Sequence, residues 1–374
     1  MIQHRHLFLS TKVLSGMRTS LHRGLFLFFS LTFFAATAST SNLADRQLIV
    51  EALQWVRSPL RSSVEYDYIM TARVHLIFFW VGKDDVGGGY IRRGISSQDP
   101  RAEFFQVLFG SDPQKAPRAV NRWGAGTEVA WHKDPISLPS REDDVTSSAF
   151  FGFMKSSRGR SVGEMQSELR KEQEQGQHSF TGILSRVEPF RAVSTIVPLL
   201  SDTDFNLHQY NLAEPLMFDR IAAADRPVRS LEDRSRCPRS ASFLATVADL
   251  MDAALAGQAA PLSRCYVHDA QENTLTLERV LPLQKLPVQL HGPNSTVLLD
   301  TSYANLLQLD YVSKHKETGK TVSFSILVGT QGNLRGVPVQ IRYQPNWWFQ
   351  VVLNLRPDSA LIPPSAPASA LVSR

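Results

Sequence analysis

Cysteine is scarce in this sequence, and no catalytic motif is built on it. Cys237 and Cys265 are the only cysteines among 374 residues, and neither lies in the sequence context of a protease nucleophile. The cysteines therefore indicate no hydrolytic nucleophile.

Motifs for nucleotide cofactors and for zinc are also absent. The sequence contains neither the phosphate-binding loop pattern nor the glycine fingerprint of dinucleotide-binding proteins. Of the seven histidines after residue 38, no two lie within five residues of each other, so the paired histidines of helical or hairpin zinc sites are missing. We expect neither a bound cofactor nor a metal site.

The chain lacks the excess of positive charge that nucleic-acid binding requires. It contains 40 basic and 35 acidic residues, but four of the basic residues fall in residues 1–38, where there is no acid. Removing those four leaves 36 basic residues against 35 acids. Because a nucleic-acid-binding domain needs a basic stripe on its folded surface, we expect no nucleic acid among the partners.

No apolar run is long enough to span a membrane. The run Leu25–Ala36 has 12 residues, whereas a spanning helix needs about 20. Arg18 and Arg23 precede this run, and the small residues Ala36-Thr37-Ala38 follow it, which is the order of a cleavable secretory signal. We expect cleavage near Ala38, export to the periplasm or the extracellular space, and no transmembrane anchor.

The remaining chain is expected to have a globular part and a tail. Translation from Met17 would give a signal of ordinary length, so we expect Met17 to be the true start. Residues 39–356 form a β-rich globular region, either one large domain or two intimately packed domains. Residues 357–374 are rich in Pro, Ala and Ser and have no apolar period, which predicts a disordered tail.

Three segments are expected to be helical. Residues 43–58 and 242–256 carry apolar residues at helical spacing along one face. Residues 161–176 begin with Ser161 and Glu164 placed as a capping box, but they hold few apolar residues. We therefore expect the first two to pack on the core and the third to be an exposed insert.

Strands dominate the rest of the sequence, which predicts an α+β fold that is predominantly antiparallel β, arranged as a sandwich or an open barrel. Residues 66–80 alternate between apolar and polar side chains. A C-terminal meander of four antiparallel strands is expected at residues 307–311, 322–328, 337–343 and 347–355. Shorter apolar segments at 104–109, 150–154, 183–187 and 275–280 would extend this sheet or form a second one. In the meander we expect a common buried side made by Val322, Phe324, Val339, Ile341, Phe349 and Val351.

The glycine triplet Gly87–Gly89 is interpreted as a hairpin loop, because a strand precedes it and no helical period follows it. Arg92 and Arg93 would then point to opposite faces of the returning strand. A guanidinium there could bind a carboxylate or phosphate of a ligand. The alternative is an arginine at a sheet edge that pairs with Asp84 or Asp85 at the entry of the turn.

Trp347 and Trp348 are adjacent, so a strand would place one indole on each face. One should be core, and the other is either covered by a second layer or exposed as a platform for recognition. Together with Arg92 and Arg93, these tryptophans are the candidate ligand-binding residues of the sequence.

Cys237 and Cys265 bracket the helix expected at 242–256. In an oxidising compartment an isolated pair of cysteines is more often bonded than free, and we predict a disulfide between them, with two buried thiols as the alternative.

These observations favour an exported, non-catalytic protein that binds a ligand or interacts with a protein of the envelope or the extracellular space. The main alternative is an extracytoplasmic hydrolase whose catalytic residues converge only on folding. A structural component of the envelope is a third hypothesis.

Overall fold

The computed structural model describes residues 43–76, 79–112, 114–117, 120–135, 145–157, 181–198, 228–232, 240–292 and 295–357, together with Ser167, Lys171, Glu174 and Cys237. All of them belong to the unit formed by residues 37–374. The predicted signal and all but Pro357 of the predicted tail lie outside the described residues.

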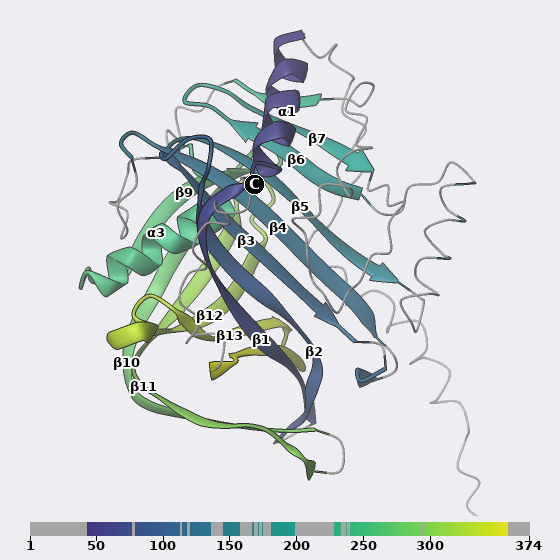
Figure 1. The fold of residues 1–374 in the computed structure, drawn as a ribbon, viewed down its shortest axis with the longest axis vertical. Helices are drawn as coiled ribbons and strands as arrows, with labels where there is room; N and C mark the ends of the chain where they lie inside the picture. Colours follow the sequence, from purple (N-terminus) through teal and green to yellow (C-terminus); the bar gives the residue numbers. More distant parts are fainter. Residues whose placement is uncertain are drawn as a thin grey trace, which may run out of the picture. The chain divides into compact units, whose positions relative to one another are not determined.

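Within the described ranges, fourteen strands form one antiparallel sheet (Figure 1). Its order is β8-β7-β6-β5-β4-β3-β2-β1-β14-β13-β12-β11-β10-β9. The sheet therefore consists of two meanders, and in each of them strands that are consecutive in sequence pair with each other. The two meanders are joined where β1 pairs with β14. The first meander consists of β1 (Leu60–Leu76), β2 (Phe79–Ser96), β3 (Ala102–Ser111), β4 (Asn121–His132), β5 (Val145–Ser157), β6 (Thr181–Val187), β7 (Ala192–Pro198) and β8 (Val228–Leu231). The second consists of β9 (Leu262–His268), β10 (Gln271–His291), β11 (Val297–His315), β12 (Thr321–Gly329), β13 (Pro338–Asn346) and β14 (Phe349–Leu355).

The predicted C-terminal meander is confirmed as β11 to β14, which pair antiparallel in sequence order. The only helix described between Thr321 and Leu355 is a 3₁₀ turn at Gly332–Leu334. The additional apolar segments form β3, β5, β6 and β10 of the same sheet.

The predicted common buried side of this meander is only partly correct. Of its six residues, Val339 is fully buried and the other five are half-buried. The better buried positions lie further along the strands: Ile326 packs in the cluster that contains α3, and Leu353 packs in the cluster that contains residues of β1. Val322 and Phe349 lie near the other ends of their strands.

The helices predicted at residues 43–58 and 242–256 are confirmed as α1 (Leu43–Val56) and α3 (Phe243–Leu255). Of the third predicted helix, Ser167, Lys171 and Glu174 are described, and they are helical and exposed. No helix in the described ranges is long and apolar enough to cross a membrane.

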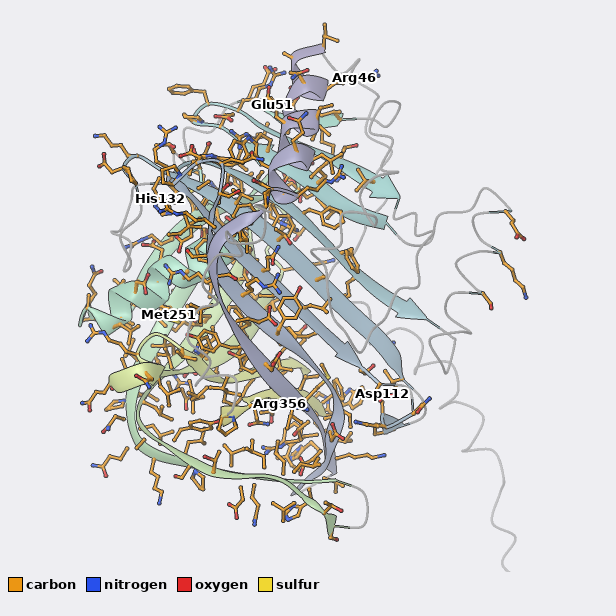
Figure 2. All side chains as sticks on the ribbon, in the orientation of Figure 1. Arg46, Glu51, Asp112, His132, Met251 and Arg356 are labelled. Atoms are coloured by element: carbon orange, nitrogen blue, oxygen red, sulfur yellow. A yellow bond between two sulfur atoms is a disulfide. The ribbon has the colours of Figure 1, made fainter. Side chains whose placement is uncertain are left out.

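The two helices cover opposite faces of β3 and β4. Successive residues of a strand point to opposite faces, and Phe104 packs in the core cluster that contains α1, whereas Phe105 packs against Ala245 of α3. Beneath α1 lie Phe104, Leu108, Val129, Trp131, Phe151, Phe153, Leu184, Val193 and Val197. Met251 of α3 (Figure 2) packs with Leu250 and Ala254 against Tyr266, Leu275, Leu277, Leu309, Tyr311, Ile326 and Val328.

The prediction of a hairpin loop at Gly87–Gly89 is wrong. The connection between β1 and β2 follows Leu76, and the glycines lie inside β2, paired on one side with Tyr68–Met70 and on the other with Phe109–Ser111. A Cβ atom at Gly87 or Gly89 would collide with a backbone carbonyl oxygen of β3. The triplet therefore permits close approach of neighbouring strands, a role that local sequence does not distinguish from a turn.

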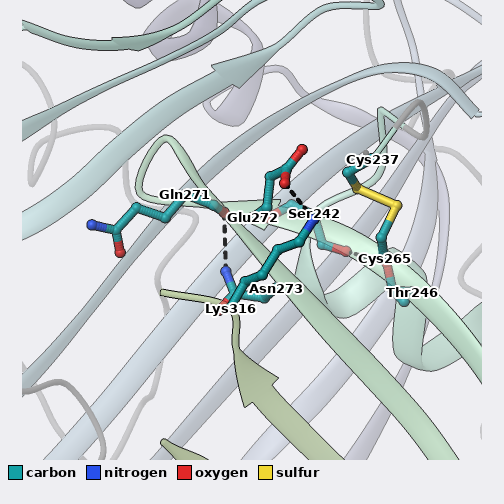
Figure 3. Close-up of a disulfide and its surroundings, with 8 residues drawn as sticks. All are labelled: Cys237, Ser242, Thr246, Cys265, Gln271, Glu272, Asn273 and Lys316. Carbon is teal, nitrogen blue, oxygen red and sulfur yellow. Dashed lines mark hydrogen bonds and ion pairs between the residues drawn. A yellow bond between two sulfur atoms is a disulfide. The ribbon is translucent and has the colours of Figure 1, made fainter. Parts of the chain in front are cut away.

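The predicted disulfide is confirmed, and it links the two ends of the sheet. Cys237 follows β8 and Cys265 lies in β9, with their Cα atoms 5.5 Å apart (Figure 3). Asp269, in the turn after β9, accepts a hydrogen bond of 2.9 Å from Ser194 of β7 and pairs at 2.8 Å with Arg229 of β8. A covalent bond, a hydrogen bond and an ion pair thus connect strands that share no backbone ladder.

Candidate functional site

Arg92 and Arg93 point to opposite faces of β2, but β2 is an interior strand between β1 and β3. Arg92 Nε donates to Glu65 Oε2 of β1 at 2.6 Å, and its Nη1 donates to Gln106 Oε1 of β3 at 3.3 Å. The alternative of an edge-strand arginine paired with Asp84 or Asp85 is therefore wrong. Asp84 instead accepts from Thr71 Oγ1 and from the backbone N–H of His291, each at 3.0 Å, and fastens the end of β10 to β2.

Arg93 belongs to a charged cluster between the sheet and α3. Its Nε lies 2.5 Å from Glu103 Oε1, and its Nη2 lies 3.6 Å from Asp252 Oδ2 of α3. The other oxygen of Glu103 lies 3.0 Å from Nε2 of His132, at the end of β4 (Figure 2). Burial opposes ionisation of Glu103, yet Arg93 and His132 together hold the pKa of this carboxyl below its usual value.

A second buried carboxylate caps α3. Glu128 of β4 accepts hydrogen bonds from the backbone N–H groups of Ser242, Leu244 and Ala245 at 2.8, 2.7 and 3.1 Å. These donors belong to the first turn of the helix, where no intrahelical acceptor exists. Burial raises the pKa of Glu128 to about 7, and the three N–H donors limit the rise.

Both carboxylates are engaged by the fold itself. Each oxygen of Glu103 and each oxygen of Glu128 has a protein partner, and Glu103 is only 1% exposed. This arrangement joins β2, β3 and β4 to α3 electrostatically. The part of the chain that the structure describes contains no group of three or more His, Cys, Asp or Glu placed to hold a metal ion.

Trp347 and Trp348 occupy a turn, so the prediction that they lie in the last strand is wrong. They connect β13, which ends at Asn346, to β14, which begins at Phe349, and Asn346 pairs with Phe349 across the turn. The residues Gln344-Pro345-Asn346, predicted as the turn, belong to β13, where the register shifts between Tyr343 and Asn346. Aromatic residues favour strands, and this preference misled the assignment.

The turn at Trp347 lies beside the end of the β1–β2 hairpin, because β1 pairs with β14. We call His75, Trp80, Val81, Trp347 and Trp348 the hairpin-end cluster. The rings of His75 and Trp80 lie 4.8 Å apart, and those of His75 and Trp347 lie 6.2 Å apart at 88°. The backbone N–H of His75 donates to the carbonyl oxygen of Trp348 at 2.8 Å.

Three apolar members of this cluster are exposed to water, and Trp348 is half-buried. Trp347 is 71% exposed, Val81 46% and Trp80 39%. An apolar residue exposed singly needs no explanation, but neighbouring large apolar residues commonly mark an interaction surface. Sequence reasoning identified the two adjacent tryptophans and missed His75 and Trp80, although the run His75-Leu76-Ile77-Phe78-Phe79-Trp80 is unusually aromatic for a hairpin.

The surroundings of the hairpin-end cluster carry positive charge. Residues 73–83 and 343–352 contain Arg73 and Lys83 but no Asp or Glu. Lys83 is exposed, and Arg73 and Arg342 are half-buried. The pKa of Arg342 is lowered by burial and by the nearby charge of Arg73, and the carboxylate of Asp310 opposes this shift.

The chain was compared with known proteins by sequence and by structure. No protein-family model matches the chain, and no curated protein matches it in sequence. The fold is similar, with a TM-score of 0.39 and 11% sequence identity, to the crystal structure of a beta-barrel-like protein of the domain of unknown function DUF1849 from Brucella abortus. The similarity covers 80% of this chain and 97% of that chain.

Proposed function

We propose that this protein is an exported, non-catalytic interaction protein that binds its partner through the hairpin-end cluster. The observation that carries the proposal is the exposure of Trp80 and Trp347, which both contact the ring of His75, at the ends of two paired hairpins. Trp combines a large apolar surface with an N–H donor and is enriched where proteins bind partners. The proposal includes an envelope or extracellular location for that partner.

Export is supported by the N-terminal sequence pattern and by the disulfide. The Cys237–Cys265 bond fits an oxidising compartment, since disulfides rarely persist in a reducing cytosol. N-terminal sequencing of the protein recovered from cells is expected to give a chain that begins at or near Ser39. Recovery of an intact Met1 chain from the cytosol would contradict the proposed location.

We also propose that residues 39–356 act as one domain, with the open barrel favoured over the sandwich. This proposal is supported by the single hydrogen-bonded sheet and by the contacts of Cys265 and Asp269 with the opposite end of the strand order.

Among the described residues, the Arg93 cluster is the candidate catalytic site for the alternative of a hydrolase. We favour a structural role for this cluster because a catalytic acid or base must reach a substrate proton within about 3 Å. The Glu103 carboxylate is buried, and its oxygens already contact Arg93 and His132. A hydrolytic activity that is lost in Glu103→Gln, with the folded structure retained, would favour the enzyme instead.

The interaction site can be tested by photo-cross-linking in the cells that make the protein. A benzophenone amino acid at position 347 is expected to form adducts with an envelope component, because Trp347 would lie against the partner. The matched control is the same amino acid in place of Phe190, which is 83% exposed in the turn between β6 and β7. Equal adduct formation at both positions, or none at position 347, would contradict the proposed site.

A further inference from the structure

We infer that the partner of the hairpin-end cluster is the surface of an anionic lipid bilayer. This inference rests on the proposed function and specifies its partner by chemistry. Its starting point is the pair of neighbouring hairpin ends at which Trp80 of β2 and Trp347 of the β13–β14 turn are exposed.

The first argument is the composition of the two hairpin ends. Three of the six tryptophans of the chain, Trp80, Trp347 and Trp348, lie within residues 73–83 and 343–352. Trp is enriched at the interface between lipid and water, because its ring is apolar and its N–H can bond to headgroups or water. Hairpin turns that face only water normally carry Gly, Asn, Asp or Pro, so a turn made of two tryptophans needs a different environment.

The second argument is geometric. Val74 of β1 pairs with Phe349 of β14, and His75 pairs with Trp80 within the β1–β2 hairpin. The turns of both hairpins therefore lie at the same end of their strands. Both turns can reach one flat surface together. The contacts of His75 with Trp80 and Trp347 hold the aromatic rings as one unit before binding, which reduces the entropy lost on binding.

The third argument is charge. Arg73, Lys83 and Arg342 lie along the same strands, just behind the aromatic ends, and the two hairpin-end segments contain no acid. Long basic side chains beside interfacial aromatic residues can extend their charged groups to lipid phosphates. A bilayer with anionic headgroups attracts each such cation, whereas a neutral bilayer offers the aromatic residues alone a weaker site.

The test is co-sedimentation of the full protein, as purified from exporting cells, with lipid vesicles. We expect binding to vesicles of phosphatidylglycerol and phosphatidylcholine in equal parts, and much weaker binding to phosphatidylcholine alone. Lipids brominated on the acyl chains should quench part of the tryptophan emission of the wild-type protein, and less of the emission of Trp347→Ala. Binding should weaken as salt concentration rises.

Variants separate the aromatic and the basic contributions. Trp347→Ala should weaken vesicle binding about tenfold or more, and Lys83→Gln about fivefold. Phe190→Ala, which removes an exposed aromatic side chain elsewhere, should bind as the wild type does. These three side chains are at least partly exposed, so the variants should fold, and Trp347→Phe should recover part of the affinity lost in Trp347→Ala.

The inference is overturned if the protein does not bind the anionic vesicles, if it binds both vesicle types equally, or if Trp347→Ala binds as tightly as the wild type. If cross-linking at position 347 captures a protein while the vesicles stay unbound, the proposed interaction site stands and the lipid partner is wrong. If position 347 gives no adduct and no vesicle binding occurs, both proposals fail.

Discussion

At the scale of single residues, Arg92 and Arg93 show how burial sets the strength of an ion pair. Arg93→Met would leave the buried carboxylate of Glu103 without its main counter-charge, which typically costs about 3–5 kcal/mol. Arg92→Met is the matched control, because Arg92 pairs with the half-buried Glu65, which water still reaches, and pairs that water reaches contribute about 0–1 kcal/mol. Denaturant unfolding measures the free energy of unfolding of both variants. An equal loss of this free energy in the two variants would contradict the prediction.

A second residue-scale prediction concerns the pH dependence of stability. Burial raises the pKa of Glu128 to about 7 in the folded protein, above the ordinary value of 4.5 for a glutamate. Between these values the folded state binds more protons than the unfolded state, so the contribution of Glu128 to the free energy of unfolding falls as pH rises. The slope contributed by this group should be absent from Glu128→Gln.

The measurement is the free energy of unfolding of both proteins from pH 4.5 to pH 8. The difference between wild type and Glu128→Gln should change by a few kcal/mol up to about pH 7 and stay constant above it. Identical slopes for the two proteins would show that the three helical N–H donors lower the pKa of Glu128 at least as much as burial raises it. Comparing the two proteins cancels the other titrating groups, including Glu103, whose lowered pKa acts with the opposite sign.

At the scale of elements, the glycines of β2 are not equivalent. In Gly89→Ala the new Cβ would collide with the carbonyl oxygen of Leu108 and come within 2.7 Å of the Phe109 ring, so β2 and β3 would have to separate. We expect a loss of about 1–3 kcal/mol. In the control, Gly82→Ala, the nearest atom is Cγ of Arg73 at an ordinary 3.5 Å, and stability should change by less than about 0.5 kcal/mol. Thermal unfolding of the two variants distinguishes these outcomes, and a stable Gly89→Ala would refute the close approach.

Elements with a regular apolar period could be predicted from the sequence, and those that depend on a distant neighbour could not. The alternation at Val322, Phe324 and Ile326 is a local property, and it predicted β12 correctly. Gly87 looks like a turn residue until β3 is placed beside it. The roles of Gly and aromatic residues depend on what packs against them, so the local sequence does not predict these roles.

The candidate site likewise combines residues that the local sequence identifies with residues that it does not identify. Trp347 and Trp348 attract attention in the sequence, but their partners His75 and Trp80 belong to the opposite end of the chain and approach them only because β1 pairs with β14. A pairing between the first and the last strand leaves no local signal. Arg93 likewise has partners in β3 and α3 that no local pattern connects to it.

At the scale of the whole molecule, the regions of β8 and β9, the two outermost strands of the sheet, are connected through side chains. β8 is a short strand of four residues, and its region is held to β9 by the disulfide and by Arg229 and Asp269. Val267 of β9 packs in the small cluster with Val187 and Ala192. This junction lacks a backbone ladder, so it should depend on the covalent link more than the interior strands do.

The last prediction tests that dependence. The double variant Cys237→Ala/Cys265→Ala should lose about 3–4 kcal/mol, because the disulfide closes a loop between cysteines separated by 28 residues. Hydrogen exchange should accelerate in β9 and around Ser194 and Asp269, where the junction opens first. In β3 and β4, which lie between other strands and under α1, exchange should change little. Dithiothreitol should reproduce these effects in the wild type and have none in the double variant, which controls for loss of the thiols themselves. Unchanged stability of the double variant would mean that Asp269 and the packing of Val267 suffice to hold the ends of the sheet together.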